Sequence, residues 1–494
     1  MADGGEVGRI ALKPWRPSLK SPNSGMTADC DGILPKPDGF TFWPGPVAET
    51  TALPAASCGA ITIFDDASNP QTFGGTGAGL YKVQSGSPLP TWATVSGPSA
   101  PYHCDPSQKW QWAQWGQTIV AVNINDNPQT AALSGGNFSD LAGSPPRAKL
   151  VHVYMDFMLL ANLSTNSRVL QWCAINDNTT WTPGVNLSDT QELADGGPIY
   201  GLAGTSSVYV LQSECIRRMT FSPGSPETFD IVKIVSDRGC ENPDSIVELG
   251  DAVFFLSRDG FWMLDASGMQ PISANKIDTW ILDNIPLANR FLTEGMVDPV
   301  QHRVYWSVKS VNAPAGNIGP DLMLCYDFVN KEWTKATITT RHLINWVASG
   351  YSLDVLGQFG NLDTLPYSLD SSFWQGKRRA PAMIDQNGVL NSFSGPALPA
   401  LIEVTDFQPI PGRRIWVSGI TLDTDCIGWT LQMGSRERFG DPLNWGSVIT
   451  HESTGMAGAA SNSRYIRPRF QMPQGATWKI ATSFVPQISG SGDI

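Results

Sequence analysis

Histidine and carboxylate side chains are the first candidates for chemistry in this 494-residue chain. A metalloprotease-type site would show H-x-x-x-H or H-E-x-x-H. Asp423 and Asp425 could form a calcium pair, but no EF-hand loop surrounds them, so turn residues are the simpler interpretation. The five histidines are widely scattered and form neither histidine motif: His103, His152, His302, His342 and His451. The sequence therefore predicts no catalytic residue, no metal site and no cofactor, and we expect no enzymatic activity.

Motifs for nucleophiles and for phosphate binding are also missing. No G-x-S-x-G segment marks a serine nucleophile. The glycines of residues 73–81 lack the G-K-[ST] of a phosphate loop, and a turn is the simpler interpretation. The eight cysteines are far apart and include no C-x-x-C pair, which indicates buried thiols in a reducing compartment.

Two basic stretches are candidates for contact with a partner or with DNA. Residues 377–379 form the densest basic run, for which a solvated loop is the alternative. Residues 464–470, RYIRPRF, alternate basic and apolar residues with period two, so one face of that strand is basic. An exposed strand face without a partner is the alternative there. The candidate residues are Lys377, Arg378, Arg379, Arg464, Arg467 and Arg469.

Composition and charge narrow the fold and the class of partner. Glycine (48) and proline (37) together exceed their usual share, and only 16% of the residues are charged, which favours a β-rich chain with many turns. The formal charge of −12 argues against a broad basic surface that grips nucleic acid. The N-terminal residues contain no apolar signal segment, and no apolar run is long enough for a membrane span.

A repeated pattern of a small polar turn followed by an apolar run predicts a β-propeller. The runs begin at residues 116, 155, 206, 250, 302 and, less clearly, 350. Their spacing of 39 to 52 residues is typical of propeller blades with four strands each. We interpret the runs as inner strands buried between blades, and we expect about six or seven blades.

Four units follow from this pattern. Residues 1–58 are rich in proline and are expected to form an extended arm, whose aromatic residues favour binding along another surface. Residues 59–356 are assigned to the propeller, with a short helix near 281–290. Residues 357–398 interrupt the pattern and are interpreted as an insertion or linker. Residues 399–494 contain six strand candidates and predict a small β-sandwich-like unit.

Several of these segments resemble one protein family. Residues 246–281, IVELGDAVFFLSRDGFWMLDASGMQPISANKIDTWI, resemble the propeller segment of the tail nozzle (hub) proteins of short-tailed bacteriophages, also called packaged-DNA stabilisation proteins. Residues 168–181, 318–333 and 463–478 look like further parts of that family. The resemblance covers residues 110–350 well and the last 90 residues loosely. Its motifs are packing patterns and carry no chemistry.

The resemblance implies a structural virion protein of the tail, assembled in the cytoplasm of the host bacterium. Such proteins form a homo-hexameric ring below the head-to-tail adaptor ring, a conduit that retains packaged DNA and lets it pass on ejection. Tail fibres or spikes attach around the ring, and a needle or plug closes it in some tails. Double-stranded DNA would pass without sequence-specific contacts.

An alternative from another class is a propeller enzyme or lectin that acts on bacterial surface glycans. Trp110, Trp112 and Trp115 could stack on sugar rings, although a strand of core aromatic residues is the simpler interpretation. A third alternative is an adhesin or a baseplate-like binding module.

Overall fold

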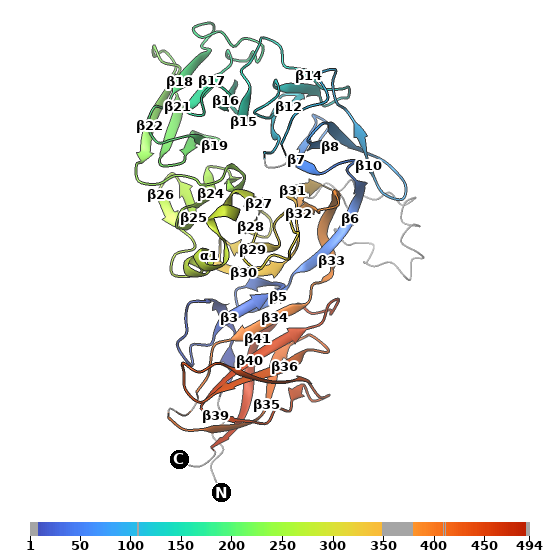
Figure 1. Cartoon of the computed structure of the whole chain (residues 1–494), viewed down its shortest axis with the longest axis vertical. Coiled ribbons are helices and arrows are strands. Elements are labelled where there is room, and N and C mark those ends of the chain that lie inside the picture. Colours follow the sequence, from blue (N-terminus) through green and yellow to red (C-terminus); the bar gives the residue numbers. More distant parts are fainter. Residues whose placement is uncertain (1–7, 106–107, 348–378, 409, 411, 491–494) are drawn as a thin grey trace.

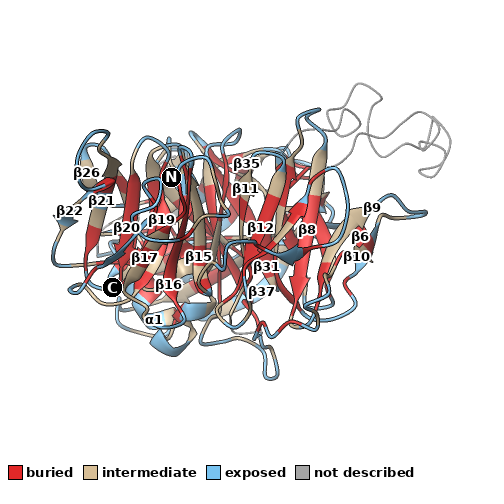
Figure 2. Ribbon diagram, turned by 90° about the horizontal axis from the view of Figure 1, so that it is seen from above, coloured by how far each residue is buried: buried red, intermediate tan, exposed pale blue. Residues whose placement is uncertain are grey.

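The chain forms a ring of four-stranded sheets with a β-sandwich attached to one side. The computed structural model describes residues 8–105, 108–347, 379–408, 410 and 412–490. Both termini lie at the end of the sandwich that is farthest from the ring (Figure 1). Buried residues follow the strands, whereas the loops at their ends are exposed (Figure 2). The all-β propeller fold is therefore confirmed.

The described residues form seven four-stranded antiparallel sheets, which are the blades, and the strands of each blade run in order from the innermost to the outermost. Blade one comprises β7 (Ser57–Phe64), β8 (Pro70–Thr76), β9 (Leu80–Gln84) and β10 (Thr91–Thr94). Blade two comprises β11 (Gln111–Trp115), β12 (Thr118–Val122), β13 (Gln129–Ala132) and β14 (Ser139–Asp140). Blade three comprises β15 (Ala148–Tyr154), β16 (Phe157–Leu163), β17 (Val169–Trp172) and β18 (Asp189–Glu192).

The remaining blades complete the ring. Blade four comprises β19 (Ile199–Ala203), β20 (Val208–Gln212), β21 (Ile216–Phe221) and β22 (Phe229–Val235). Blade five comprises β23 (Val247–Leu249), β24 (Ala252–Ser257), β25 (Gly260–Asp265) and β26 (Gly268–Pro271). Blade six comprises β27 (Glu294–Asp298), β28 (Arg303–Val308), β29 (Leu322–Asp327) and β30 (Glu332–Thr337). Blade seven comprises β31 (His342–Val347), β32 (Arg379–Ile384), β33 (Val389–Ala397) and β6 (Pro44–Ala52).

Blade seven closes the ring with strands from both ends of the chain. Its outer strand β6 precedes blade one in sequence and pairs antiparallel with β33. Its inner strand β31 packs beside β7 of blade one. Two parts of the predicted domain division are therefore corrected. Residues 44–52 belong to the propeller instead of an arm, and residues 379–397 of the expected insertion are also blade strands. Residues 357–378 lie outside the described residues.

The repeated apolar runs are the second strands of their blades, not the inner strands. The runs that begin near residues 116, 155, 206, 250 and 302 become β12, β16, β20, β24 and β28. Second strands are covered on both faces by neighbouring blades, and every residue of β16 and β20 is buried. Inner strands face the channel and keep half-exposed residues, as in β11. The run at 350 lies outside the described residues.

Phe254 in β24 tests this strand assignment. Its side chain is 1% exposed and packs against Phe328 of blade six at a centroid distance of 6.1 Å. Replacement by alanine is expected to lower the free energy of unfolding by about 3–5 kcal/mol, because a large cavity opens between two blades. Chemical denaturation measures this change. A loss below about 1 kcal/mol would mean that this side chain contributes little to packing between the blades.

The sandwich is built from both ends of the chain. Its first sheet contains β1 (Ile10–Ala11), β4 (Ile33–Lys36), β5 (Gly39–Phe42), β35 (Ile415–Thr424), β38 (Met456–Ala457), β39 (Ser461–Ser463) and β41 (Ala481–Gly490). Its second sheet contains β2 (Lys13–Trp15), β3 (Met26–Asp31), β34 (Ala400–Val404), β36 (Thr430–Arg436), β37 (Asn444–Thr450) and β40 (Tyr465–Met472). Residues 10–42 of the proposed arm are therefore integral to the sandwich. Pro14 and Pro35 are tolerated there because β2 and β4 are edge strands.

Propeller and sandwich share one hydrophobic core. Trp306 and Trp333 of blade six belong to the same buried cluster as Phe40 and Phe470 of the sandwich. Backbone bonding continues across the junction, because the N–H of Gly32 donates to the carbonyl of Lys335 at 3.1 Å. An interface of this kind holds the two units as a single rigid body.

The expected helix near residues 281–290 is split by proline. The structure contains α1 (Asp278–Asn284), followed by the 3₁₀ helix η2 (Leu287–Leu292) after Pro286. Another 3₁₀ turn, η1 (Pro243–Ser245), precedes the inner strand of blade five. Trp280 of α1 packs edge-on against Trp15 of the sandwich at 5.1 Å. This segment therefore helps to join blade five to the sandwich.

Candidate functional site

A salt bridge crosses the propeller at the end of the channel where the inner strands begin. Lys109 precedes β11 of blade two, and its Nζ lies 3.2 Å from Asp244 Oδ2 and 3.0 Å from Glu294 Oε2. Asp244 belongs to η1 of blade five, and Glu294 begins β27 of blade six. The three side chains are only 13–16% exposed. One lysine therefore joins blades on opposite parts of the ring.

His342 extends this network to the seam where the ring closes. Its Nδ1 lies 3.3 Å from Glu294 Oε2, and its Nε2 lies 2.9 Å from the Ser57 carbonyl oxygen of blade one. The side chain is 2% exposed. His342 of blade seven thus connects blades six and one.

A second histidine joins the blades that the first network does not reach. His152 of β15 places Nε2 3.1 Å from the carbonyl oxygen of Gly204 and Nδ1 3.8 Å from Glu248 Oε1. These partners belong to blades four and five. A cavity of about 340 Å³ beside His152 is lined by β11, β15, β19 and β23. The two networks together link all seven blades around the channel.

The charges of the first network stabilise one another. Burial would lower the pKa of Lys109, but Asp244 and Glu294 outweigh it and raise that pKa. Burial would also raise the pKa of Glu294, but Lys109 and His342 outweigh it and lower that pKa to about 2. By contrast, burial raises the pKa of Glu248, and His152 offsets this only in part. The network around Lys109 is therefore suited to hold the ring closed.

Sequence reasoning missed this network because its members are far apart in the chain. Lys109, Asp244, Glu294 and His342 span more than 230 residues and form no motif. In the sequence, the only sign of this network is the position of its residues relative to the inner strands. Each lies at or just before the beginning of an inner strand. This shared position can be recognised from the sequence only after the inner strands have been correctly assigned.

The basic run of residues 377–379 is described only in part. Lys377 and Arg378 lie outside the described residues. Arg379 begins β32, and its guanidinium carbon lies 5.2 Å from the centroid of the Phe64 ring of blade one. Arg379 therefore contributes a contact between blades seven and one.

The basic strand face exists, but two of its arginines are used within the chain. Arg467 Nε lies 2.8 Å from Asp406 Oδ1, and its Nη1 lies 3.0 Å from Glu403 Oε1. Arg469 Nη2 lies 2.7 Å from Glu403 Oε2, and its guanidinium carbon lies 3.7 Å from the Trp445 ring centroid. Arg464 is half-buried and makes no ion pair with the described residues. Arg467 and Arg469 thus lie on one face of β40 (Tyr465–Met472), and contact of this face with a partner or DNA remains a prediction.

The three tryptophans considered for sugar stacking, and Asp425 considered for calcium, make contacts within the fold. Trp110 is buried, and its Nε1 donates to the Thr76 carbonyl at 3.0 Å, so its ring is not presented to a sugar. Trp112 and Trp115 are half-buried and pack against neighbouring core clusters. Asp425 accepts the backbone N–H groups of Lys479 and Ile480, so its carboxylate is used within the sandwich.

Metal ligation and disulfide bonding find no support among the described residues. No group of three or more His, Cys, Asp or Glu side chains in this part of the chain is arranged to hold a metal ion. All eight cysteines are buried and unpaired, which confirms the expectation of buried thiols.

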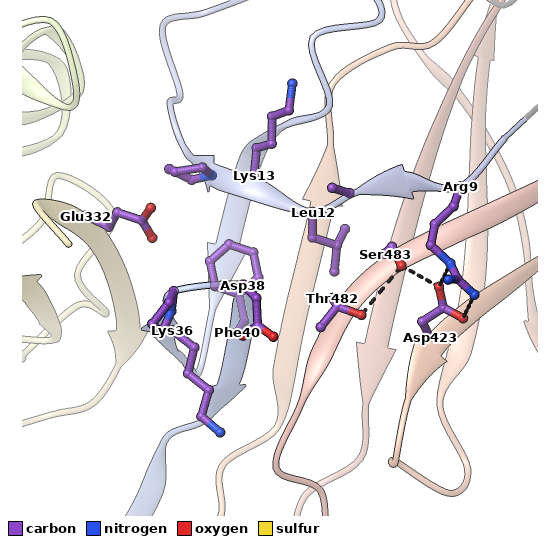
Figure 3. Close-up of a pocket in the computed structure, with 14 residues that line it drawn as sticks. Arg9, Leu12, Lys13, Lys36, Asp38, Phe40, Glu332, Asp423, Thr482 and Ser483 are labelled. Carbon is purple, nitrogen blue, oxygen red and sulfur yellow. Dashed lines mark hydrogen bonds and ion pairs between the residues drawn. The ribbon is translucent and has the colours of Figure 1, made fainter.

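A cavity of about 790 Å³ lies at the junction of propeller and sandwich (Figure 3). Arg9 Nε lies 2.8 Å from Asp423 Oδ2, and Ser483 also donates to Asp423. Glu332 faces the cavity from blade six (Figure 3). Burial raises the pKa of Glu332 to about 7, with Arg16 opposing the shift and Asp327 adding to it.

Glu332 gives a test of this electrostatic environment. A carboxyl group whose pKa is raised in the folded state destabilises the fold once it is ionised, so stability should fall as pH rises from about 4.5 to about 7. Replacement of Glu332 with glutamine should raise the melting temperature at pH 8 and leave it nearly unchanged at pH 4. Calorimetry at both values measures the difference. An equal shift at both values would contradict the assignment.

Comparisons with known proteins found only distant structural similarities, and these carry no argument about activity. No family model and no curated protein matches the chain. BamB from Moraxella catarrhalis has 12% identity and a TM-score of 0.36, covering 78% of this chain and 96% of that chain. The WD40 domain of Toxoplasma gondii coronin has 8% identity and a TM-score of 0.39, covering 77% and 87%. YCF48 from Cyanidioschyzon merolae has 12% identity and a TM-score of 0.37, covering 71% and 98%.

The described helices are all short, and none of them could cross a bilayer.

Proposed function

We propose that this chain is a structural protein of a short-tailed phage tail, the subunit of a hexameric nozzle below the adaptor ring. In this proposal the ring retains packaged DNA and lets it pass on ejection. It also contacts the adaptor, tail fibres or spikes and a needle or plug. The resemblance of residues 246–281 to such proteins supports this function. The observation that carries it is the pair of polar networks, around Lys109 and around His152, that together link the seven blades into a closed scaffold.

The network also indicates where DNA would pass. The side chains of Lys109, Asp244 and Glu294 meet inside the channel of a single propeller. A duplex could not follow that route without breaking buried ion pairs, so a conduit must form between subunits. Six copies carry six times −12, or −72 formal charges, which repel the phosphate backbone and give it little to grip.

The shared core suits a rigid subunit in such a ring. Propeller and sandwich are joined by buried aromatic residues and by backbone hydrogen bonds, so their relative orientation is fixed. A ring under pressure from packaged DNA requires subunits of this kind. Loops and the sandwich remain available for partners.

Mass photometry of the purified chain, alone and with its adaptor protein, tests the proposal. Six copies of the 53.4 kDa chain would give a particle of about 320 kDa. A strictly monomeric chain under both conditions would contradict it. Binding or hydrolysis of bacterial surface polysaccharide by the monomer would instead favour the glycan alternative.

A further inference from the structure

Four exposed apolar residues lie together at one end of blade three, and we call them the blade-three patch. Backbone hydrogen bonds hold their segments side by side. The N–H of Asn176 donates to the Asp156 carbonyl at 2.7 Å, and the N–H of Ile175 donates to the Asn186 carbonyl at 3.1 Å. Single exposed apolar residues are common, whereas contiguous ones mark contact surfaces. The patch residues are 39–58% exposed: Met155, Ile175, Val185 and Leu187.

Met155 occupies a backbone position that suits glycine. Two-residue loops, 116–117, 155–156 and 250–251, join the first and second strands of blades two, three and five. The first residue of each loop has a left-handed φ, +53° at Gly116, +51° at Met155 and +62° at Gly250. This conformation is unfavourable for a residue with a Cβ atom. Blade three thus has an exposed methionine where two other blades have glycine.

Leu187 is held in the same unfavourable conformation. Its φ is +67°. Its carbonyl oxygen accepts from Trp172 Nε1 at 2.8 Å and from Thr228 Oγ1 at 3.0 Å, so the loop is fixed by both bonds. Folding alone would favour Gly or Asn at positions 155 and 187, because both types adopt a left-handed φ readily. Contact with a partner accounts for two exposed apolar side chains at these positions.

The surroundings of the patch are acidic. Asp156 follows Met155 and Asp189 comes two residues after Leu187, and both carboxylates are exposed. Glu227, also exposed, precedes the Thr228 that bonds to the Leu187 loop. Residues 155–157, 173–189 and 222–228 contain no lysine or arginine, and these three carboxylates form no ion pair with the described residues. A partner with basic groups beside apolar ones would match this surface.

We propose that the blade-three patch binds a segment of a partner protein in which apolar residues are flanked by lysine or arginine. The site goes beyond the proposed nozzle function, because the whole patch belongs to one chain. Blade three lies on the side of the ring away from the sandwich, so the sandwich does not cover it (Figure 1). A second copy is the less suitable occupant, since each copy carries a net charge of −12.

Isothermal titration of the full chain at low ionic strength tests the proposal with three peptides. These are acetyl-Lys-Leu-Phe-Leu-Lys-amide, a counterpart with Gln in place of Lys, and a counterpart with Ser in place of the apolar residues. The first peptide should bind at least about tenfold more tightly than either counterpart, because each counterpart loses one of the two complementary features. Equal binding of either counterpart, or no binding of the first peptide at millimolar concentration, would overturn the proposal.

A double variant locates the binding without harming the fold. Met155→Gly combined with Leu187→Asn should weaken binding of the first peptide about tenfold. Its melting temperature should stay the same or rise, because the new residues suit the left-handed φ. Val300→Ser is the matched control and should leave the affinity unchanged, because Val300 is a 53% exposed residue in the β27–β28 loop of blade six.

Three outcomes of the variant experiment would contradict the assignment. They are unchanged affinity of the double variant, an equal loss with Val300→Ser, and a lower melting temperature of the double variant, which would mean that folding needs these side chains. Sedimentation velocity separates a partner from a second copy. The unmodified protein and the double variant should sediment alike, and dissociation of an assembly in the double variant would assign the patch to contact between copies and overturn the proposal.

Discussion

Replacement of Glu294 with glutamine is expected to lower the free energy of unfolding by about 3–5 kcal/mol. Glu294 accepts from both Lys109 and His342 inside the channel. Its removal leaves a buried lysine with only Asp244 and a buried histidine with only the Ser57 carbonyl. Chemical denaturation measures the change. Glu192→Gln is the matched control, because Glu192 pairs with Arg168 on the surface and should cost less than about 1 kcal/mol.

The acid dependence of stability provides a second measurement on the same residue. A carboxyl group whose pKa is depressed to about 2 in the folded state stabilises the fold above its unfolded value of 4.5. This contribution is lost as pH falls from about 4.5 to about 2. The Glu294→Gln variant should therefore lose less stability than the unmodified protein in that window. Parallel curves for the two proteins would show that the ion pairs contribute little.

Removal of residues 1–53 is expected to abolish cooperative folding. These residues supply β1–β5 to the sandwich and β6 to blade seven. They also bury Trp15, Phe40 and Trp43, each at most 1% exposed. Loss of one such aromatic side chain costs about 3–5 kcal/mol, so three together approach or exceed the whole stability of about 5–15 kcal/mol. Differential scanning calorimetry should show no transition for the truncated chain.

Supplying the missing segment as a separate chain controls for expression defects. Co-expression of residues 1–53 with residues 54–494 should restore a single melting transition, because the strands can pair without a covalent link. A truncated chain that melts cooperatively near the temperature of the full chain would contradict the assignment. It would mean that residues 1–53 act as the independent arm that their prolines suggest.

The propeller could be predicted from the sequence because blade packing repeats. Each second strand is buried on both faces and therefore leaves a continuous apolar run, such as residues 252–257 in β24. Inner strands were harder to identify, since one side faces the channel and mixes polar with apolar residues. Blade seven could not be completed from the sequence pattern. Its outer strand β6 precedes blade one in sequence, so periodicity does not assign β6 to blade seven.

The sandwich and the candidate site show the limits of local patterns. Proline-rich residues 10–42 form short strands because they pair with β34 and β41, which come more than 350 residues later. The alternation at residues 464–470 is reflected in Arg467 and Arg469, which share one face of β40. The acidic partners Glu403 and Asp406 could not be recognised from that segment alone. Both the N-terminal strands and the ion pairs of these arginines depend on partners that are far away in the sequence.

Cryo-electron microscopy of the phage tail to which we propose to assign this protein tests the central claim most directly. The proposal predicts six copies around a common lumen, with each propeller outside the lumen and its own channel occupied by Lys109, Asp244 and Glu294. DNA density would then run between subunits. Absence of this protein from the tail, a ring without sixfold symmetry, or DNA density through the channel of a single propeller would contradict the account.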